Sequence, residues 1–153
     1  PLGKIPTLVT DDGATWFGSS VILERMDHLC ANPAMFPLDA GRRLETRCRE
    51  ALGDGIMELM IAWITERYNP SKRTDVVLAR SANKLTKSLD RLELSIERYQ
   101  EVDAGSISVA CALSYIDFRF SDIKWRQGRS RIHAWHDQFC RRPTMLKSEF
   151  QDG

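Results

Sequence analysis

The feature that most constrains the fold is a stripe of apolar residues in the middle of the chain. Between residues 73 and 101, apolar side chains recur at alternating spacings of four and three. The members of the stripe are Leu78, Ala82, Leu85, Leu89, Leu92, Ile96 and Tyr99. This spacing puts them on one face of an α-helix, and that face must pack against other apolar surface. The stripe is compatible with a coiled coil, but beside other amphipathic helices it favours a seam within a helical bundle.

Other helices are predicted around this one. Residues 39–68 are expected to form one long helix that ends at Asn69 and Pro70. Its apolar positions are Leu44, Cys48, Leu52, Ile56, Met60, Trp63 and Ile64. A last helix is expected at about residues 129–141. Its inward positions are Ile132, Trp135, Phe139 and Cys140.

The sequence indicates that a helix begins after Asp103. The Asp103 side chain can accept a hydrogen bond from the backbone N–H of Ser106, while the Ser106 hydroxyl reaches back. Val102 and Ile107 flank this box at the positions of a hydrophobic staple. Residues 106–116 carry no charge, so the helix they begin is expected to be surrounded by others. The box is therefore predicted to be structural rather than catalytic.

The first thirty residues have a different pattern. Residues 5–10 are rich in β-forming side chains, residues 11–13 (Asp-Asp-Gly) are a turn signal, and residues 15–17 are again β-prone. This order predicts a β-hairpin. Ser19 or Ser20 then offers an N-cap to a helix that runs to about Leu29.

The chain is expected to divide into two units. Residues 31–38 contain two prolines and no helical period, which is typical of a linker. Residues 1–30 form the expected small α+β unit, and residues 39–153 the expected all-helical unit.

Composition limits the class of protein and of partner. Hydrophobic residues make up 42% and charged residues 28% of the chain, which is typical of a globular protein. The net charge of +1 gives no large field for nucleic acid or anionic lipid, so neither nucleic acid nor a membrane is an expected partner. The four cysteines are too far apart in sequence for a CxxC motif. Buried, reduced thiols and a cytoplasmic location are therefore expected.

Several short segments carry a resemblance to a known family. Residues 3–8 (Gly-Lys-Ile-Pro-Thr-Leu), 11–13 and 17–22 (Phe-Gly-Ser-Ser-Val-Ile) are similar, in this order, to the second half of the thioredoxin-like domain of glutathione transferases. Residues 51–57 and 110–119 resemble segments of one bacterial subgroup. The C-terminal part of the sequence resembles the same family at Trp125, Arg126, Trp135 and residues 142–145. The resemblance spans nearly the whole chain and implies a glutathione-binding unit followed by the helical domain of this family.

The resemblance implies a glutathione site at Lys4, Ile5, Pro6, Gly18 and Ser19. In the family a serine at a helix N-terminus binds the γ-glutamyl carboxylate, a role that falls here to Ser19. A cis proline, here Pro6, exposes the backbone of Ile5 to the cysteinyl part, and Lys4 is near the glycyl carboxylate. The residue before the serine is acidic in the family, but Gly18 has no carboxylate. The residues alone leave open a plain N-cap at Ser19, a trans Pro6 and a solvated Lys4.

The resemblance also implies an activity and what it needs. In the family a tyrosine, serine or cysteine stabilises the glutathione thiolate, and it lies in a first strand, helix and second strand of about 50 residues before the position of Pro1. The catalytic residue is thus expected outside these 153 residues, which are expected to be inactive alone. The implied enzyme is a cytoplasmic, homodimeric, detoxifying transferase that joins glutathione, as co-substrate, to a small electrophile. A non-catalytic interaction module, or a glutathione-dependent reductase, isomerase or dehalogenase, remains an alternative.

Two further groups of residues are candidates. Met57, Met60 and Ile61 lie on the expected helix that in the family lines the electrophile pocket, although they suit an ordinary core equally. His133 and His136 are three residues apart, but no third ligand lies at a useful spacing. No metal is therefore expected.

Overall fold

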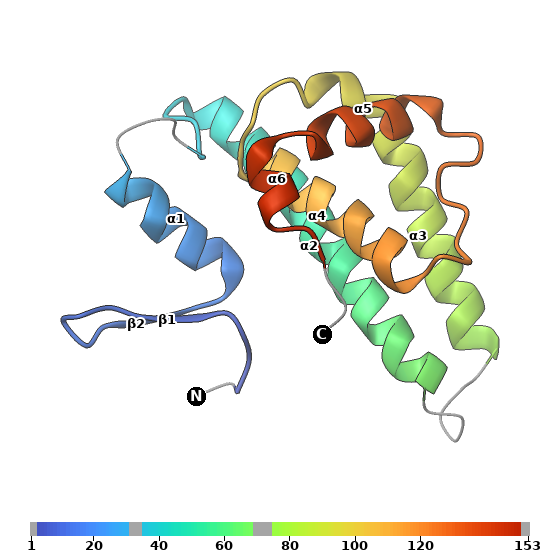
Figure 1. The fold of residues 1–153 in the computed structure, drawn as a ribbon, viewed down its shortest axis with the longest axis horizontal. Coiled ribbons are helices and arrows are strands. Elements are labelled where there is room, and N and C mark those ends of the chain that lie inside the picture. The colour runs from blue at the N-terminus through green and yellow to red at the C-terminus, as the bar shows by residue number, and fades with distance from the viewer. Residues whose placement is uncertain (1–2, 31–34, 69–74, 151–153) are drawn as a thin grey trace.

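The computed structural model describes residues 3–30, 35–68 and 75–150, and it begins with a small hairpin unit (Figure 1). Strands β1 (Thr7–Val9) and β2 (Thr15–Phe17) pair antiparallel, with Leu8 opposite Trp16. Helix α1 (Ser19–Leu29) follows directly and packs against both strands. The predicted hairpin and the helix after it are confirmed.

The rest of the described chain is helical. Its elements are α2 (Ala40–Tyr68), α3 (Asp75–Ser95), the 3-10 turn η1 (Ile96–Arg98), α4 (Ala104–Arg119), α5 (Ser130–Cys140) and α6 (Pro143–Lys147). Helix α4 contacts both α2 and α5, and α3 contacts the same two helices (Figure 1). The predicted fold class, a hairpin and helix before an all-helical bundle, is confirmed. Among the described helices, none is both long and apolar enough to cross a membrane.

Two details of the helical part differ from the prediction. The helix expected over residues 73–101 leaves the α-helical conformation after Ser95 and continues as η1. Helix α6 was not predicted, because the last helix expected from the sequence ends at about residue 141. Proline is also favoured in the first turn of a helix, where no N–H is needed, and Pro143 starts α6 in this way.

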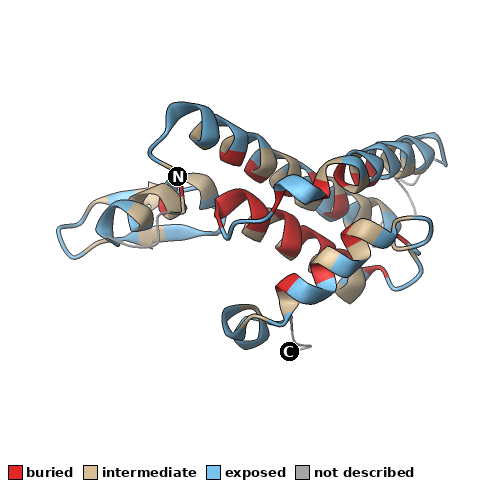
Figure 2. Cartoon of the chain, turned by 90° about the horizontal axis from the view of Figure 1, so that it is seen from above, coloured by how far each residue is buried: buried red, intermediate tan, exposed pale blue. Residues whose placement is uncertain are grey.

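Buried residues gather where the long helices face one another, whereas Ile22 is the only buried residue among the strands of the hairpin and α1 (Figure 2). The predicted stripe supplies Leu85, Leu89, Leu92, Ile96 and Tyr99 to this core, and each is at most 6% exposed. The other core members come mainly from α2 and α4. They include Ile56, Met60, Val109, Ala112, Leu113, Ile116, Phe120, Trp125 and Ile132.

The first half of α2 does not follow its apolar pattern. Leu44 is 67% exposed and Cys48 is exposed, whereas Thr46 and Glu50 are buried. The reason is that this end of α2 faces the polar start of α4, where the Thr46 hydroxyl donates to the Asp103 carboxylate at 2.8 Å. Polar side chains can occupy an inner face when their groups are hydrogen-bonded. The hydrophobic pattern alone could not identify this face.

Helices α2 and α4 approach each other at two glycines. A Cβ added to Gly53 would lie 2.3 Å from the Ser108 Oγ and 2.7 Å from the backbone nitrogen of Val109. A Cβ added to Gly105 would lie 2.6 Å from the Cβ of Arg49. Real Cβ atoms do not come this close to other atoms, so only glycine permits this contact.

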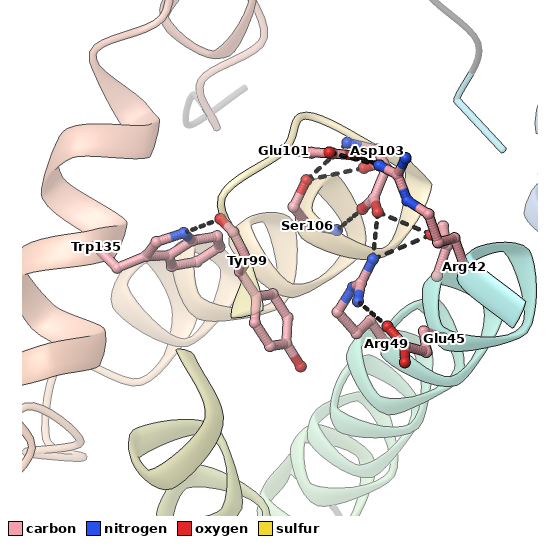
Figure 3. A network of polar contacts seen from close by, with 9 residues as sticks. Arg42, Glu45, Arg49, Tyr99, Glu101, Asp103, Ser106 and Trp135 are labelled. Atoms are coloured by element: carbon pink, nitrogen blue, oxygen red, sulfur yellow. Dashed lines mark hydrogen bonds and ion pairs between the residues drawn. The ribbon is translucent and has the colours of Figure 1, made fainter. Parts of the chain in front are cut away.

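Asp103 stands at the centre of a polar network between these helices (Figure 3). Its Oδ1 accepts from the backbone N–H of Ser106 at 2.8 Å, and its own N–H donates to the Ser106 Oγ at 2.9 Å. The predicted capping box is confirmed. Its Oδ2 accepts from the Thr46 hydroxyl and, at 2.5 Å, from the Arg49 guanidinium. The same carboxylate therefore caps α4 and ties it to α2.

A glycine replacement can test the close contact. Gly53→Ala should lower the free energy of unfolding by about 1–3 kcal/mol or more, because backbone atoms of α4 must move. Gly55→Ala is the matched control, since nothing lies within 4 Å of a Cβ there. That variant should gain about 0.5–1 kcal/mol from helix propensity. Urea unfolding measures the free energy of unfolding of both variants. A Gly53→Ala protein as stable as the Gly55→Ala protein would contradict the close contact between α2 and α4.

The Asp103 side chain is predicted to stabilise the fold by more than an N-cap alone does. Asp103→Ala should cost about 2–4 kcal/mol, because it removes the cap and leaves Arg49 without its buried partner. Asp103→Asn should cost less, since asparagine is an equally good N-cap but carries no charge for Arg49. Thermal and urea unfolding of the two variants separate the contributions. Equal losses in both would assign the whole effect to the charge.

Candidate functional site

A pocket of about 350 Å³ lies at the open end of the hairpin, beside the start of α1. Two chain segments line it, residues 3–7 and residues 17–19. Lys4, Ile5, Pro6, Gly18 and Ser19, the residues that the sequence singled out, all belong to this lining. The structure thus brings together residues that lie about a dozen positions apart in the chain.

Backbone geometry builds the pocket. The Ile5–Pro6 peptide bond is cis, as expected. The N–H of Gly18 donates to the carbonyl of Pro6 at 3.4 Å and joins the two segments. The Thr7 hydroxyl donates to the carbonyl of Lys4 at 3.0 Å, which folds the entering segment back. Ile5 itself is 95% exposed, so its backbone is open to a ligand that pairs as an added strand.

The start of α1 differs from the prediction in one respect. Its N-cap is Gly18, with no side-chain cap, and Ser19 is the first helical residue. Gly18 has a φ of 89°, which glycine adopts without the cost that a Cβ would bring. Because the cap position is taken by glycine, neither Ser19 nor Ser20 acts as the N-cap.

The two serines have different surroundings. The Ser20 hydroxyl accepts a hydrogen bond from Arg47 of α2 at 2.6 Å. The Ser19 side chain is exposed on the pocket wall and has no hydrogen-bond partner among the described residues. The first N–H groups of a helix lack intrahelical acceptors and carry partial positive charge. Ser19 and these N–H groups can therefore bind an anion together.

Ion pairs connect the unit that carries the pocket to the bundle. The Glu24 carboxylate of α1 pairs with Arg43 and Arg47 of α2. The Asp27 carboxylate accepts from the backbone N–H of Phe36 at 3.2 Å, and the Phe36 ring is buried beneath the Arg47 guanidinium. Phe36 belongs to the predicted linker, of which residues 31–34 lie outside the described residues. Its burial fixes how the pocket unit enters the helical part.

The candidate electrophile residues on α2 have three different environments. Met60 is fully buried in the core, Met57 is half-buried against it, and Ile61 is 53% exposed. Only Met57 and Ile61 can meet a ligand without a rearrangement of the core. An electrophile pocket at these residues remains a prediction.

A second cavity, of about 570 Å³, lies between α4, α5 and α6. Its lining includes Ser114, His136 and Cys140. The sequence did not predict that these three residues share a site. His133 instead pairs with Asp137, at 3.1 Å. The i, i+4 spacing of His136 and Cys140 was the signal that could have found the pair. Within the described ranges, no group of three His, Cys, Asp or Glu residues could hold a metal ion.

Comparisons with known proteins place the chain in a family. No protein-family profile matches it. It is 32% identical to the uncharacterized GST-like protein YibF of Escherichia coli (strain K12), over 97% of this chain and 76% of YibF. A glutathione transferase family member from Pseudomonas fluorescens Pf-5, solved with bound S-(propanoic acid)-glutathione, superposes with a TM-score of 0.94 at 35% identity. That match covers 99% of this chain and 80% of the other.

A glutathione S-transferase from Methylobacillus flagellatus KT, solved with glutathione bound, gives a TM-score of 0.90 at 27% identity. This match covers 96% of the present chain and 76% of the Methylobacillus chain. Sequence and fold agree over nearly all of these residues, from the hairpin to α6. The chain therefore belongs to the GST-like family, the family of the glutathione transferases.

Proposed function

We propose that the protein containing these residues is a glutathione transferase, a cytoplasmic homodimer that conjugates glutathione to a small electrophile in detoxification. The observation that carries the proposal is the hairpin pocket. One cavity is lined by all five residues that the family resemblance assigns to glutathione, and the Ser19 hydroxyl on its wall has no partner among the described residues. Relatives from Pseudomonas and Methylobacillus were solved with glutathione or a glutathione conjugate bound, which supports the same ligand here.

Each part of glutathione has a matching group in this proposal. The γ-glutamyl carboxylate binds the Ser19 hydroxyl and the N–H groups at the start of α1, as charge-assisted hydrogen bonds. The cysteinyl backbone pairs with the exposed backbone of Ile5. Lys4 lines the same pocket, and its ammonium attracts the glycyl carboxylate in this proposal.

Conjugation is then a thiolate addition. Lowering the pKa of the glutathione thiol and holding the thiolate beside the electrophile supply the rate enhancement. The residue that lowers this thiol pKa is not assigned to any of residues 1–153. Met57 and Ile61 are the groups that we expect the electrophile to meet on α2.

One observation favours a second candidate function. In the family an acidic residue faces the γ-glutamyl ammonium, but Gly18 has no carboxylate. Glutathione binding that is weak or absent for this reason would favour a non-catalytic interaction module. Glutathione-dependent reductases, isomerases and dehalogenases would share the same pocket and differ in the second substrate and in the reaction. A calorimetric titration with glutathione separates the module from the enzymes, and turnover of chlorodinitrobenzene separates conjugation from the other reactions.

The proposed site predicts a specific loss of affinity. Ser19→Ala, in the full natural chain, should weaken glutathione binding by about 10- to 100-fold, because a charge-assisted hydrogen bond of roughly 1.5–3 kcal/mol is lost. Isothermal titration calorimetry measures the change. At saturating glutathione, turnover should fall much less, since this contact holds the ground state and the transition state alike.

Ser20→Ala is the matched control for this experiment. Ser20 is the next residue of α1, but its hydroxyl is bound to Arg47. Its replacement should leave the dissociation constant for glutathione nearly unchanged. Equal dissociation constants for Ser19→Ala and the unmutated protein would show that the glutathione site is misplaced.

A further inference from the structure

The cavity between α4, α5 and α6 contains a thiol and an imidazole in contact. The Cys140 Sγ lies 3.3 Å from the His136 Nε2. Ser114 of α4 contacts both groups, with its Oγ 3.0 Å from the same nitrogen and 3.7 Å from the Cys140 Sγ. A nucleophile with a base within hydrogen-bond distance is the basic arrangement of nucleophilic catalysis, and here the Ser114 hydroxyl shares the same ring nitrogen.

The surroundings of His136 keep its ring neutral. Burial lowers the pKa of His136, and the Asp117 carboxylate opposes this only in part. Arg126, paired to Asp117, lowers it further, while Asp137 raises it. A neutral imidazole can accept a proton through Nε2, the nitrogen that faces both the thiol and the hydroxyl.

The Cys140 thiol needs the His136 imidazole to remove its proton. Burial raises the pKa of Cys140, so little thiolate is present near neutral pH. Cys111, on the same cavity wall, also has its pKa raised by burial, and it has no hydrogen-bond partner among the described residues. Cys30 and Cys48 are exposed, contrary to the expectation of buried thiols. Of the four free cysteines, only Cys140 has a histidine within hydrogen-bond distance in the described part of the chain.

The lining of the cavity indicates what it can bind. Its volume of about 570 Å³ suits a small organic molecule. Phe150 closes one side, stacked on Phe118 with ring centroids 5.4 Å apart, and Met145 and Leu146 add apolar surface. The charged lining groups are two arginines and three acids, a balance that offers little to a multiply charged anion such as glutathione. An uncharged compound with an aromatic or apolar body fits best.

We propose that this cavity is a second reactive site, in which an uncharged α,β-unsaturated carbonyl compound binds and is captured by Cys140. The Cys140 thiol gives its proton to the His136 Nε2 while Sγ forms a bond to the β-carbon. The π electrons of the C=C bond move toward the carbonyl, and the α-carbon then takes the proton from the His136 imidazolium. A thioether forms, no oxidant is needed, and glutathione takes no part.

The test uses the full natural chain without glutathione, with benzylideneacetone as the probe. Peptide mapping by mass spectrometry follows each cysteine separately as the probe concentration rises. The Cys140 rate should reach a plateau, because the probe binds before it reacts. Cys30 and Cys48 are internal controls, whose rates should rise linearly. A linear Cys140 rate that does not exceed the Cys48 rate would overturn the proposal.

Variants separate the base from the pocket. His136→Asn should lower the plateau rate about 100-fold, since a general base is lost, with little change in the half-saturating concentration. His133→Asn, one helical turn earlier and paired with Asp137, is the matched control and should leave both values unchanged. An unchanged plateau in a folded His136→Asn protein, checked by circular dichroism, would refute the role of the base.

A third variant keeps the proposal testable if the His136 replacement does not fold. Phe150 is 38% exposed and lies after α6, so its removal leaves the core intact. Phe150→Ala should raise the half-saturating probe concentration several-fold while the plateau rate of Cys140 is retained. An unchanged half-saturating concentration would show that the probe does not occupy this cavity.

Discussion

The close contact between α2 and α4 is the constraint on which the rest of the structure depends. Gly53 and Gly105 allow the two backbones to approach, and Asp103 fills the polar space beside them with a cap for α4 and an ion pair to Arg49. Because α4 is almost free of charged side chains, its remaining faces must be covered by other elements. Helices α2 and α5 contact it directly, and α3 packs against both of them.

The hairpin unit depends on the same end of the bundle. Phe36 lies at the meeting point, since its backbone N–H is bound by Asp27 of α1 and its ring is covered by Arg47 of α2. The neighbouring Met35 carbonyl accepts from the N–H of Ala104, the first residue of α4. A short segment thus connects α1, α2 and α4, and it fixes the hairpin pocket relative to the helices.

The two cavities differ in the chemistry that their walls offer. The hairpin pocket presents backbone groups, a helix N-terminus and the exposed Ser19 side chain, a surface suited to carboxylates and peptide bonds. The bundle cavity presents a thiol beside a buried imidazole, under an aromatic side chain from the end of the chain. The glutathione site and the electrophile site that we propose are therefore separate in space, one lined by the hairpin and the start of α1 and the other by α4, α5 and α6.

The sequence by itself determined the elements whose signals are local. The Leu85 to Tyr99 stripe, the Asp103 capping box and the hairpin pattern each depend on neighbouring residues. The motifs around Pro6 and Ser19, together with segments of the helical part, indicated the family. Only the tertiary structure decided which residues meet across long separations. Burial of Thr46 in place of Leu44 follows from the polar start of α4, more than 50 positions away. The contact of Ser114 with His136 likewise depends on how α4 and α5 pack, because hydrophobic periodicity gives the face of a helix but not its partner.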